Sequence, residues 1–225
     1  MDEDSHSYSG DQIEVSYDVN RCIHARECVQ GLPAVFDPDK RPWIDPDNAD
    51  VDDVADVVME CPTGALQFDR TDGGPEEPVP ETNVITVWPD GPLYLRGAIE
   101  IVTQDGTTLL EDTRVALCRC GASENKPLCD NSHVDVDFEA AGTKATAESD
   151  TQTEDNDGVL TVIPMPDGPV QIQGQFEIRY ADETETTRDS SAALCRCGGS
   201  ENKPFCDGTH SDIAFSSDDQ SGRPR

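Results

Sequence analysis

The stretch CRCGASENKPLCDNSH, residues 118–133, holds three cysteines and one histidine. The stretch CRCGGSENKPFCDGTH, residues 195–210, repeats it, with every ligand-type residue displaced by 77 positions and no gap. The residues that can bind a metal are Cys118, Cys120, Cys129 and His133, and then Cys195, Cys197, Cys206 and His210. Three thiolates and one imidazole suit a soft metal ion or an iron–sulfur cluster. The repetition predicts two equivalent metal-cluster sites built from one duplicated unit.

The two stretches also share residues that are not ligands, namely Ser123, Pro127 and Asp130 in the first and Ser200, Pro204 and Asp207 in the second. The whole pattern resembles the CDGSH iron–sulfur domain, whose mitoNEET-type members hold a [2Fe–2S] cluster with three Cys and one His. The resemblance implies that Cys118 and Cys120 bind the inner iron, and Cys129 and His133 the outer one. It implies the same roles for Cys195, Cys197, Cys206 and His210.

The first copy departs from the family pattern at Asn131, where glycine is usual. Asparagine is one of the few residues besides glycine that tolerate a positive φ, so we expect the loop to keep its shape. We also expect a short helical turn that presents Cys129 and His133, four residues apart, on one face.

Other interpretations of the pattern are a structural zinc site and disulfide bonds. A Cys3His set can bind zinc, but zinc ligands usually begin with C-x2-4-C and not with C-x-C. Disulfides are typical of secreted proteins, and the acidic, polar start of the chain is unlike a signal peptide.

Two of the four lysines, Lys126 and Lys203, occupy equivalent positions beside the expected anionic clusters. We interpret them as charge-balancing residues, with coincidence as the alternative. Arg119 and Arg196, inside the two C-x-C segments, are weaker candidates for the same role.

The chain has 225 residues, of which only 35% are apolar and 5% aromatic. This composition favours small modules stabilised by metal clusters over one large core. The formal charge is −31, from 47 acidic and 16 basic residues, which disfavours nucleic acid and membranes as partners. So acidic a chain is typical of a salt-loaded cytoplasm, where a Debye length of about 3 Å at 1 M screens self-repulsion. We therefore expect a halophilic, cytoplasmic protein, and the alternative is a disordered acidic chain.

The N-terminal part has three further cysteines, Cys22, Cys28 and Cys61, the last followed by proline. Alternating apolar residues predict a strand over 13–19, valine spacing predicts a helix over 51–60, and residues 66–68 suit a final strand. The pattern Cys22-x5-Cys28 with a later Cys61-Pro62 resembles the divergent mono-cluster 4Fe–4S ferredoxin domain.

Position 25, where a ferredoxin loop has its middle cysteine, holds alanine. Three thiolates can hold a [3Fe–4S] cluster, whereas a [4Fe–4S] cluster needs a fourth ligand from water, an added thiol or a side chain. His24 could be that ligand, or it could pack or form hydrogen bonds near the cluster. A further alternative is three unrelated free thiols, although the three motifs together use all nine cysteines.

These patterns predict an α+β protein with a small ferredoxin-like module followed by two β-rich CDGSH units that form an intramolecular pseudo-dimer. The predicted segments are a disordered acidic tail (1–12), the mono-cluster domain (13–69), a linker (70–82), CDGSH unit one (83–138), a second linker (139–157), CDGSH unit two (158–215) and a disordered tail (216–225).

No catalytic triad, phosphate loop or dinucleotide-binding pattern appears, so we expect no enzyme activity. We interpret the chain as a one-electron carrier with two [2Fe–2S] clusters and one [3Fe–4S] or [4Fe–4S] cluster. Its partners would be a reductase or acceptor, and the protein would be a monomer with an internal pseudo-two-fold. The alternatives are a cluster donor to apo iron–sulfur proteins, a redox or iron sensor, and a scaffold with structural metals.

Overall fold

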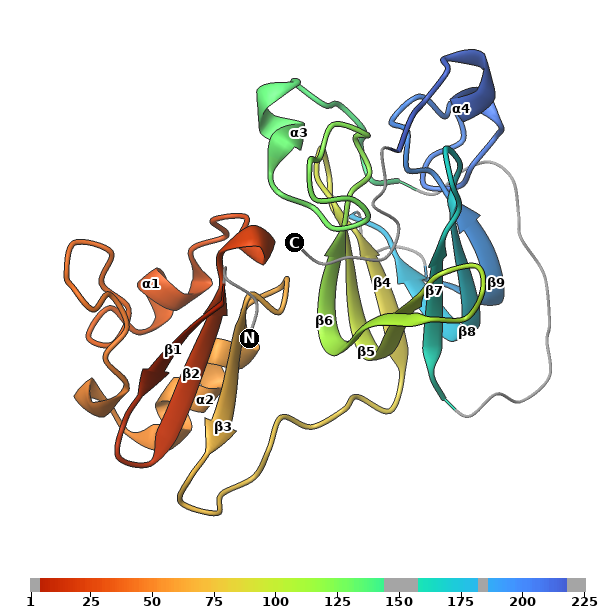
Figure 1. Ribbon diagram of the computed structural model, residues 1–225. Helices are drawn as coiled ribbons and strands as arrows, with labels where there is room; N and C mark the ends of the chain where they lie inside the picture. The colour runs from red at the N-terminus through yellow and green to blue at the C-terminus, as the bar shows by residue number, and fades with distance from the viewer. Residues whose placement is uncertain (1–4, 144–157, 182–185, 218–225) are drawn as a thin grey trace. The chain divides into compact units, whose positions relative to one another are not determined.

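The computed structural model describes residues 5–143, 158–181 and 186–217 (Figure 1). The chain divides into two compact units, Met1–Pro78 and Val79–Pro224. The division falls inside the predicted linker 70–82. The described residues are mostly strands with few helices, which confirms the β-rich α+β class.

Unit 1 is built on a three-stranded antiparallel sheet in the order β1-β2-β3. Its elements are β1 (Ser5–Ser9), β2 (Ile13–Asp18), η1 (Val19–Arg21), α1 (Glu27–Gly31), η2 (Pro46–Asn48), α2 (Val51–Met59) and β3 (Leu66–Arg70). Helix α2 begins where the Asp50 carboxylate accepts the N–H of Asp52 at 3.0 Å. It buries Val54, Ala55 and Val58 in the core that β2 and β3 share. The predicted helix over 51–60 and the two predicted strands are therefore confirmed.

The prediction of a disordered tail over residues 1–12 is wrong from residue 5 onward. Strand β1 pairs with β2 from Ser5–Asp18 to Ser9–Glu14, and the Gly10 N–H donates to the Ile13 carbonyl at 2.8 Å in the turn. Backbone hydrogen bonds stabilise this edge strand, and most of its side chains are exposed. A strand of this kind has no apolar alternation for sequence reasoning to detect.

Unit 2 contains two copies of one arrangement of three strands and a short helix (Figure 1). The first copy comprises β4 (Asn83–Val87), β5 (Leu93–Val102), β6 (Thr108–Leu117) and α3 (Ser132–Asp135). The second comprises β7 (Leu160–Pro164), β8 (Val170–Arg179), β9 (Thr186–Leu194) and α4 (Thr209–Asp212). The 77-residue offset between the ligand motifs thus extends to the strands.

The two copies exchange strand pairings within one six-stranded sheet. Strand β4 pairs in parallel with β8, so that Val84 lies opposite Glu177. Strand β5 pairs in parallel with β7, so that Glu100 lies opposite Thr161. The second pairing repeats the first with the copies interchanged, because Thr161 lies 77 positions after Val84, and Glu177 lies 77 positions after Glu100. Buried aliphatic side chains from all six strands form one shared core.

Glycine marks the point where each long strand changes partner. Residues 93–96 of β5 pair with β4, whereas residues 99–101 pair with β7. Between them lies Gly97, with a φ of 152°, where a Cβ atom would overlap the Asn83 side chain. Gly174 occupies the equivalent place in β8, with a φ of 113°. A residue without a side chain is needed at this irregularity because the backbones approach closely.

Each copy extends at least two residues beyond its predicted end. Asp90 Oδ1 accepts the N–H of Ala140 at 2.6 Å, and Asp167 Oδ1 accepts the N–H of Ser217 at 2.8 Å. The predicted unit ends at 138 and 215 are therefore too early, since a carboxylate fastens the chain beyond them. The rest of the predicted linker 139–157 and tail 216–225, namely residues 144–157 and 218–225, lies outside the described residues.

None of the helices in the described ranges combines the length and apolar character needed to cross a lipid bilayer. Short helices and half-exposed strands instead surround the two cores.

We expect Asn83→Ala to destabilise unit 2 by about 1–3 kcal/mol. The buried Asn83 amide donates to the carbonyls of Gly158 at 2.9 Å and Gln175 at 3.0 Å, and its oxygen accepts the Ala98 N–H at 2.9 Å. The substitution removes three hydrogen bonds, two of which join the copies. Denaturant unfolding measures the change, and Gln173→Ala, the loss of an exposed amide on β8, is the control. Equal stabilities of the two variants would contradict this role.

Candidate iron–sulfur cluster sites

A short extension of the sheet brings the third cysteine of each copy to the first. The Cys118 N–H donates to the Pro127 carbonyl and the Cys129 N–H to the Ala116 carbonyl, both at 2.9 Å. The equivalent bonds in the second copy join Cys195 to Pro204 and Cys206 to Ala193, both at 2.8 Å. The loop that returns after the C-x-C segment is thus fixed by backbone pairing, and the Lys-Pro peptide before each third cysteine is cis.

The four expected ligands of each copy lie as two close pairs. The Sγ atoms are 3.7 Å apart in the pair Cys118 and Cys120, and 3.8 Å apart in the pair Cys195 and Cys197. The Sγ of Cys129 is 3.5 Å from Nδ1 of His133, and the corresponding distance from Cys206 to His210 is 3.4 Å. The structure therefore brings together the residues that sequence analysis paired.

The aspartate after the third cysteine organises the loop. Asp130 accepts the N–H of Ser132 at 3.0 Å with Oδ1 and the N–H of Glu124 at 2.7 Å with Oδ2. Asp207 does the same for Thr209 at 3.0 Å and Glu201 at 2.8 Å. One carboxylate thereby connects the start of the short helix to the middle of the ligand loop.

Asn131 adopts a left-handed conformation with a φ of 77°, which confirms the expectation for this position. Gly208 has a φ of 91° in the second copy. The expected helical turn is confirmed only for His133, because α3 begins at Ser132 and Cys129 precedes the left-handed residue. The reversal at Asn131, and not helical spacing, brings the two ligands together.

The two lysines of the motifs hydrogen-bond to backbone. Lys126 Nζ donates to the Ser123 carbonyl at 2.5 Å, and Lys203 Nζ to the Ser200 carbonyl at 2.5 Å. Lys203 Nζ also lies 6.0 Å from the centre of the Phe138 ring, which belongs to the other copy. The charge-balancing role of both lysines stays a prediction.

Burial keeps most of the thiols protonated in the absence of a metal. It raises the pKa of Cys129 to about 12 and also raises the pKa of Cys195 and of Cys206. A hydrogen bond between Cys118 and Cys120, together with burial, raises the pKa of Cys118. The same hydrogen bond lowers the pKa of Cys120 to about 7, although burial opposes this shift. The N–H of Ala122 also points to Cys120 Sγ at 3.4 Å. Metal binding must therefore displace protons at most of these sulfurs.

His133 is half-buried, and its burial lowers its pKa, although the Asp130 charge opposes this shift. A lower pKa favours the neutral imidazole at neutral pH, which is the form that binds a metal.

The three cysteines of unit 1 line one hollow of about 350 Å³ that opens to solvent. Cys22 follows η1, Cys28 lies in α1 and Cys61 follows α2. Burial raises the pKa of Cys28 to about 11, and the charges of Cys61 and Cys22 add to the shift. The hollow is largely apolar, with Trp43, Ala65 and Leu66 in its wall. Three thiols that line one apolar hollow fit a cluster.

His24 does not line the hollow. It is exposed, and its Nδ1 lies 3.9 Å from the Cys22 Sγ, whereas Ala25, at the position of the missing cysteine, is part of the wall. Sequence reasoning missed Thr63 and Tyr17, which line the hollow. Thr63 Oγ1 is 3.6 Å from Cys61 Sγ, and burial and a hydrogen bond with Cys22 raise the pKa of Tyr17. The sequence gives a signal only for Thr63, which follows Cys61 by two residues, and none for Tyr17.

Within the described ranges no three Cys, His, Asp or Glu side chains converge closely enough to bind one metal ion. Cluster ligands bind separate irons and can lie further apart than the ligands of a single ion, so this spacing is compatible with clusters.

Two family descriptions match the chain. The family described as "Divergent 4Fe-4S mono-cluster" matches residues 8–71, and the family described as "Iron-binding zinc finger CDGSH type" matches residues 90–134 and 167–211. The chain belongs to both families: it joins a divergent 4Fe–4S mono-cluster domain to two CDGSH domains. The family resemblances drawn from the cysteine motifs are thereby confirmed.

Relatives of the mono-cluster domain include the "Uncharacterized protein YjdI" of Escherichia coli K12 and that of Escherichia coli O157:H7. Each is 39% identical over 61 residues, which make up 27% of this chain and 80% of the relative. No solved structure matches the chain.

We expect His133→Cys to lower the reduction potential of the first CDGSH site and to slow its loss of visible absorbance in acid. A thiolate donates more negative charge than imidazole, and it removes the ligand that a proton releases near neutral pH. Spectroelectrochemical titration and decay rates between about pH 5 and pH 8 measure both effects. His210→Cys should act in the same way on the second site. His6→Cys, on the exposed strand β1, is the control for an added thiol, and a variant as acid-sensitive as the parent would argue against histidine ligation.

We expect Cys61→Ser to remove the cluster of the mono-cluster domain and leave the visible spectrum of the CDGSH domains intact. Unit 1, which contains the hollow, has its own hydrophobic core, separate from that of unit 2. Iron and acid-labile sulfide per chain, with spectra before and after reduction, measure the outcome. Loss of all the clusters at once would contradict the independence of the two units.

Proposed function

We propose that this protein is a one-electron carrier that holds a [2Fe–2S] cluster in each CDGSH domain and a third cluster in the mono-cluster domain. Iron–sulfur clusters supply one-electron redox chemistry. The ligands are the two close pairs in each copy, and Cys22, Cys28 and Cys61 in unit 1. With one imidazole per site, the potentials of the CDGSH clusters would lie between those of all-cysteine ferredoxins and Rieske centres.

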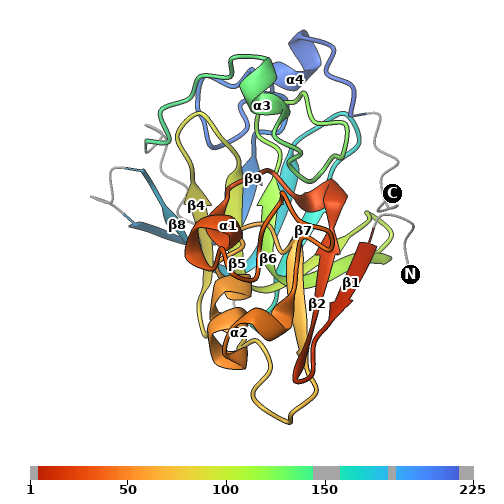
Figure 2. The same ribbon diagram turned by 90° about the vertical axis from the view of Figure 1, so that its left-hand side faces the viewer.

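The observation that carries this proposal is the contact between the two C-x-C segments. A Cβ atom on Gly121 would lie 2.7 Å from the Cys197 carbonyl oxygen, and one on Gly198 would overlap the Cys120 carbonyl oxygen. The backbone of each ligand pair therefore touches that of the other. Both loops also leave the same end of the sheet, near α3 and α4 (Figure 2). Two clusters held in this way would share an electron within one rigid unit.

The exchanged strand pairs favour a pseudo-dimer, in which the two copies take the places of two subunits. The pairing of β4 with β8 and of β5 with β7 would then supply, inside one chain, the strand pairing that a single-domain protein obtains from a second subunit. We propose a monomer on this basis.

The mono-cluster domain would adopt a ferredoxin-like arrangement and hold four irons, as its family description suggests, or three. Three thiolates suffice for [3Fe–4S], and a [4Fe–4S] cluster would take its fourth ligand from water, an added thiol or a side chain. His24 is a weak candidate because it is exposed and outside the wall of the hollow.

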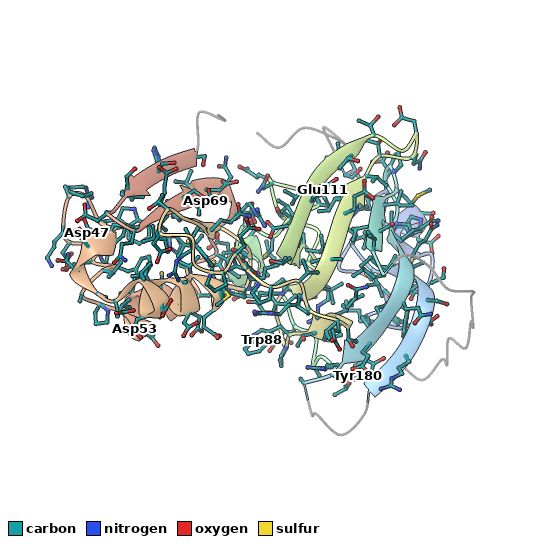
Figure 3. The ribbon with its side chains drawn as sticks, turned by 90° about the horizontal axis from the view of Figure 1, so that it is seen from below. Asp47, Asp53, Asp69, Trp88, Glu111 and Tyr180 are labelled. Carbon is teal, nitrogen blue, oxygen red and sulfur yellow. The ribbon has the colours of Figure 1, made fainter. Side chains whose placement is uncertain are left out.

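We place the protein in a salt-rich cytoplasm, without enzyme activity, with a reductase and an acceptor protein as partners. The carboxylates Asp47, Asp53 and Asp69 of unit 1 and Glu111 of unit 2 are exposed (Figure 3). A surface of this charge repels nucleic acids and anionic lipids and depends on salt for screening.

The second candidate is a cluster donor or a redox or iron sensor. A difference in exposure favours this candidate. His133 and His210 are half-buried, whereas Cys118 and Cys195 are each only 1% exposed. Water and protons therefore reach the two histidines more readily than Cys118 and Cys195, and an imidazole is released by protonation.

Mixing the loaded protein with an apo-ferredoxin distinguishes the two candidates. For a carrier, we expect the clusters to stay in place through repeated reduction by a reductase and reoxidation, because a buried thiolate, Cys118 or Cys195, would hold each of them. Absorbance, with iron counted on each separated protein, measures transfer. Efficient transfer from the oxidised state alone would favour the donor, and loaded His133→Cys protein is the matched control with a less labile ligand. Stoichiometric zinc without sulfide would overturn both candidates.

A further inference from the structure

The two C-x-C segments of unit 2 meet through the glycine that follows each of them. Gly121 has a φ of 84°, and a Cβ atom on it would lie 2.7 Å from the carbonyl oxygen of Cys197. Gly198 has a φ of 78°, and a Cβ atom on it would overlap the carbonyl oxygen of Cys120. Each glycine therefore lies directly against the backbone of a ligand residue in the other copy.

The residue that follows each of these glycines contacts the ligand sulfur of its own copy. The N–H of Ala122 points to Cys120 Sγ at 3.4 Å, and the N–H of Gly199 points to Cys197 Sγ at 3.4 Å. Hydrogen bonds to the sulfur atoms are among the contacts that tune an iron–sulfur site. A shift of the backbone at this point therefore changes a sulfur contact in one copy and presses on a ligand residue of the other.

A second contact between the copies lies beside the histidine of the first site. Lys203 Nζ is 6.0 Å from the centre of the Phe138 ring, within the range of a cation–π interaction. The Phe138 N–H donates to the carbonyl of His133 at 3.0 Å. The ligand loop of the second copy thus reaches the residues around this histidine as well as the C-x-C segment.

These contacts leave little freedom for one ligand loop to move alone. The groups nearest to a Cβ on either glycine are backbone atoms, which cannot turn aside as a flexible side chain can. The loops begin directly after β6 and β9, which belong to one sheet with a shared core. Because protein interiors are close-packed, a displacement of one group is passed to its neighbours. An ordered loop in one copy therefore favours order in the other.

We propose that the two CDGSH sites are coupled, so that a cluster bound in one copy holds the ligand pair of the other in its binding geometry. This inference rests on the proposed function. Binding replaces the thiol protons, which pass to solvent, with bonds to iron, and it fixes the C-x-C backbone. The coupling is reciprocal, since each bound cluster strengthens the binding of the other by the same factor. Gly121 and Gly198 are the positioning residues through which it acts.

The first test uses the full loaded chain with His210→Cys, so that the signal of a three-cysteine, one-histidine cluster belongs to the first site alone. We expect Gly198→Ala to release the first cluster to an iron chelator about tenfold faster, because its methyl group displaces Cys120. Gly208→Ala is the matched control. Gly208 lies in the same loop with a φ of 91°, but a Cβ on it would meet nothing within 4 Å. Both variants strain the second copy, and only the first of them presses on the other copy.

The second test empties one site and follows the other. We expect Cys129→Ser, which removes a ligand of the first site, to speed the release of the second cluster about tenfold. Cys206→Ser should speed the release of the first cluster in the same way. Cys61→Ser is the control, because it removes a ligand of unit 1, which has a separate core, and should leave both rates unchanged. Visible absorbance during chelation measures the rates.

Equal release of the first cluster from Gly198→Ala and Gly208→Ala would overturn the inference. So would unchanged rates in Cys129→Ser and Cys206→Ser, or an effect of Cys61→Ser as large as theirs. If Gly198→Ala fails to load clusters, the ligand variants decide. Iron and sulfide counts separate the outcomes. A parent without sulfide refutes the proposed function, whereas loaded variants with unchanged rates refute only the coupling.

Discussion

The exchange of strands between the two copies is the constraint on which unit 2 depends. Because β4 pairs with β8 and β5 with β7, neither copy can complete its sheet without the other. Strands β6 and β9 then finish at the same end of the sheet, and the ligand loops begin there with Cys118 and Cys195. The sites are therefore held relative to each other by the same hydrogen bonds that form the core, and their contact at Gly121 and Gly198 follows from the pairing.

Electrostatics imposes the second constraint, since an acidic chain must also accommodate anionic clusters. Burial raises the pKa of the Cys129 and Cys195 thiols, so they hold their protons more firmly, and metal binding would exchange those protons for iron. Each C-x-C segment contains a buried arginine, Arg119 or Arg196, which is 1% exposed and lies beside a phenylalanine ring. Placing arginine inside the C-x-C segment keeps positive charge away from water, where the salt expected around this chain would screen it.

Local patterns made part of this structure predictable. The ligand sets, the left-handed Asn131 and the helix over 51–60 all depend on residues close in sequence. Strand β1 was missed because backbone bonds stabilise a polar edge strand. The ends of the copies were missed because the hydrogen bonds that hold them join Asp90 and Asp167 to residues 50 positions later in the chain.

The two kinds of site differ in how they meet water, and this difference bears on their chemistry. The mono-cluster hollow opens to solvent with all three cysteines half-buried. In the CDGSH domains Cys118 and Cys195 lie at the sheet end inside the protein, whereas His133 and His210 lie on short outer helices. Exposed apolar side chains follow each histidine, Val134 and Val136 in one copy and Ile213 in the other. If the proposed clusters are bound, Cys118 and Cys195 would hold them from the interior, and a proton or an electron would reach them from the side of the histidines.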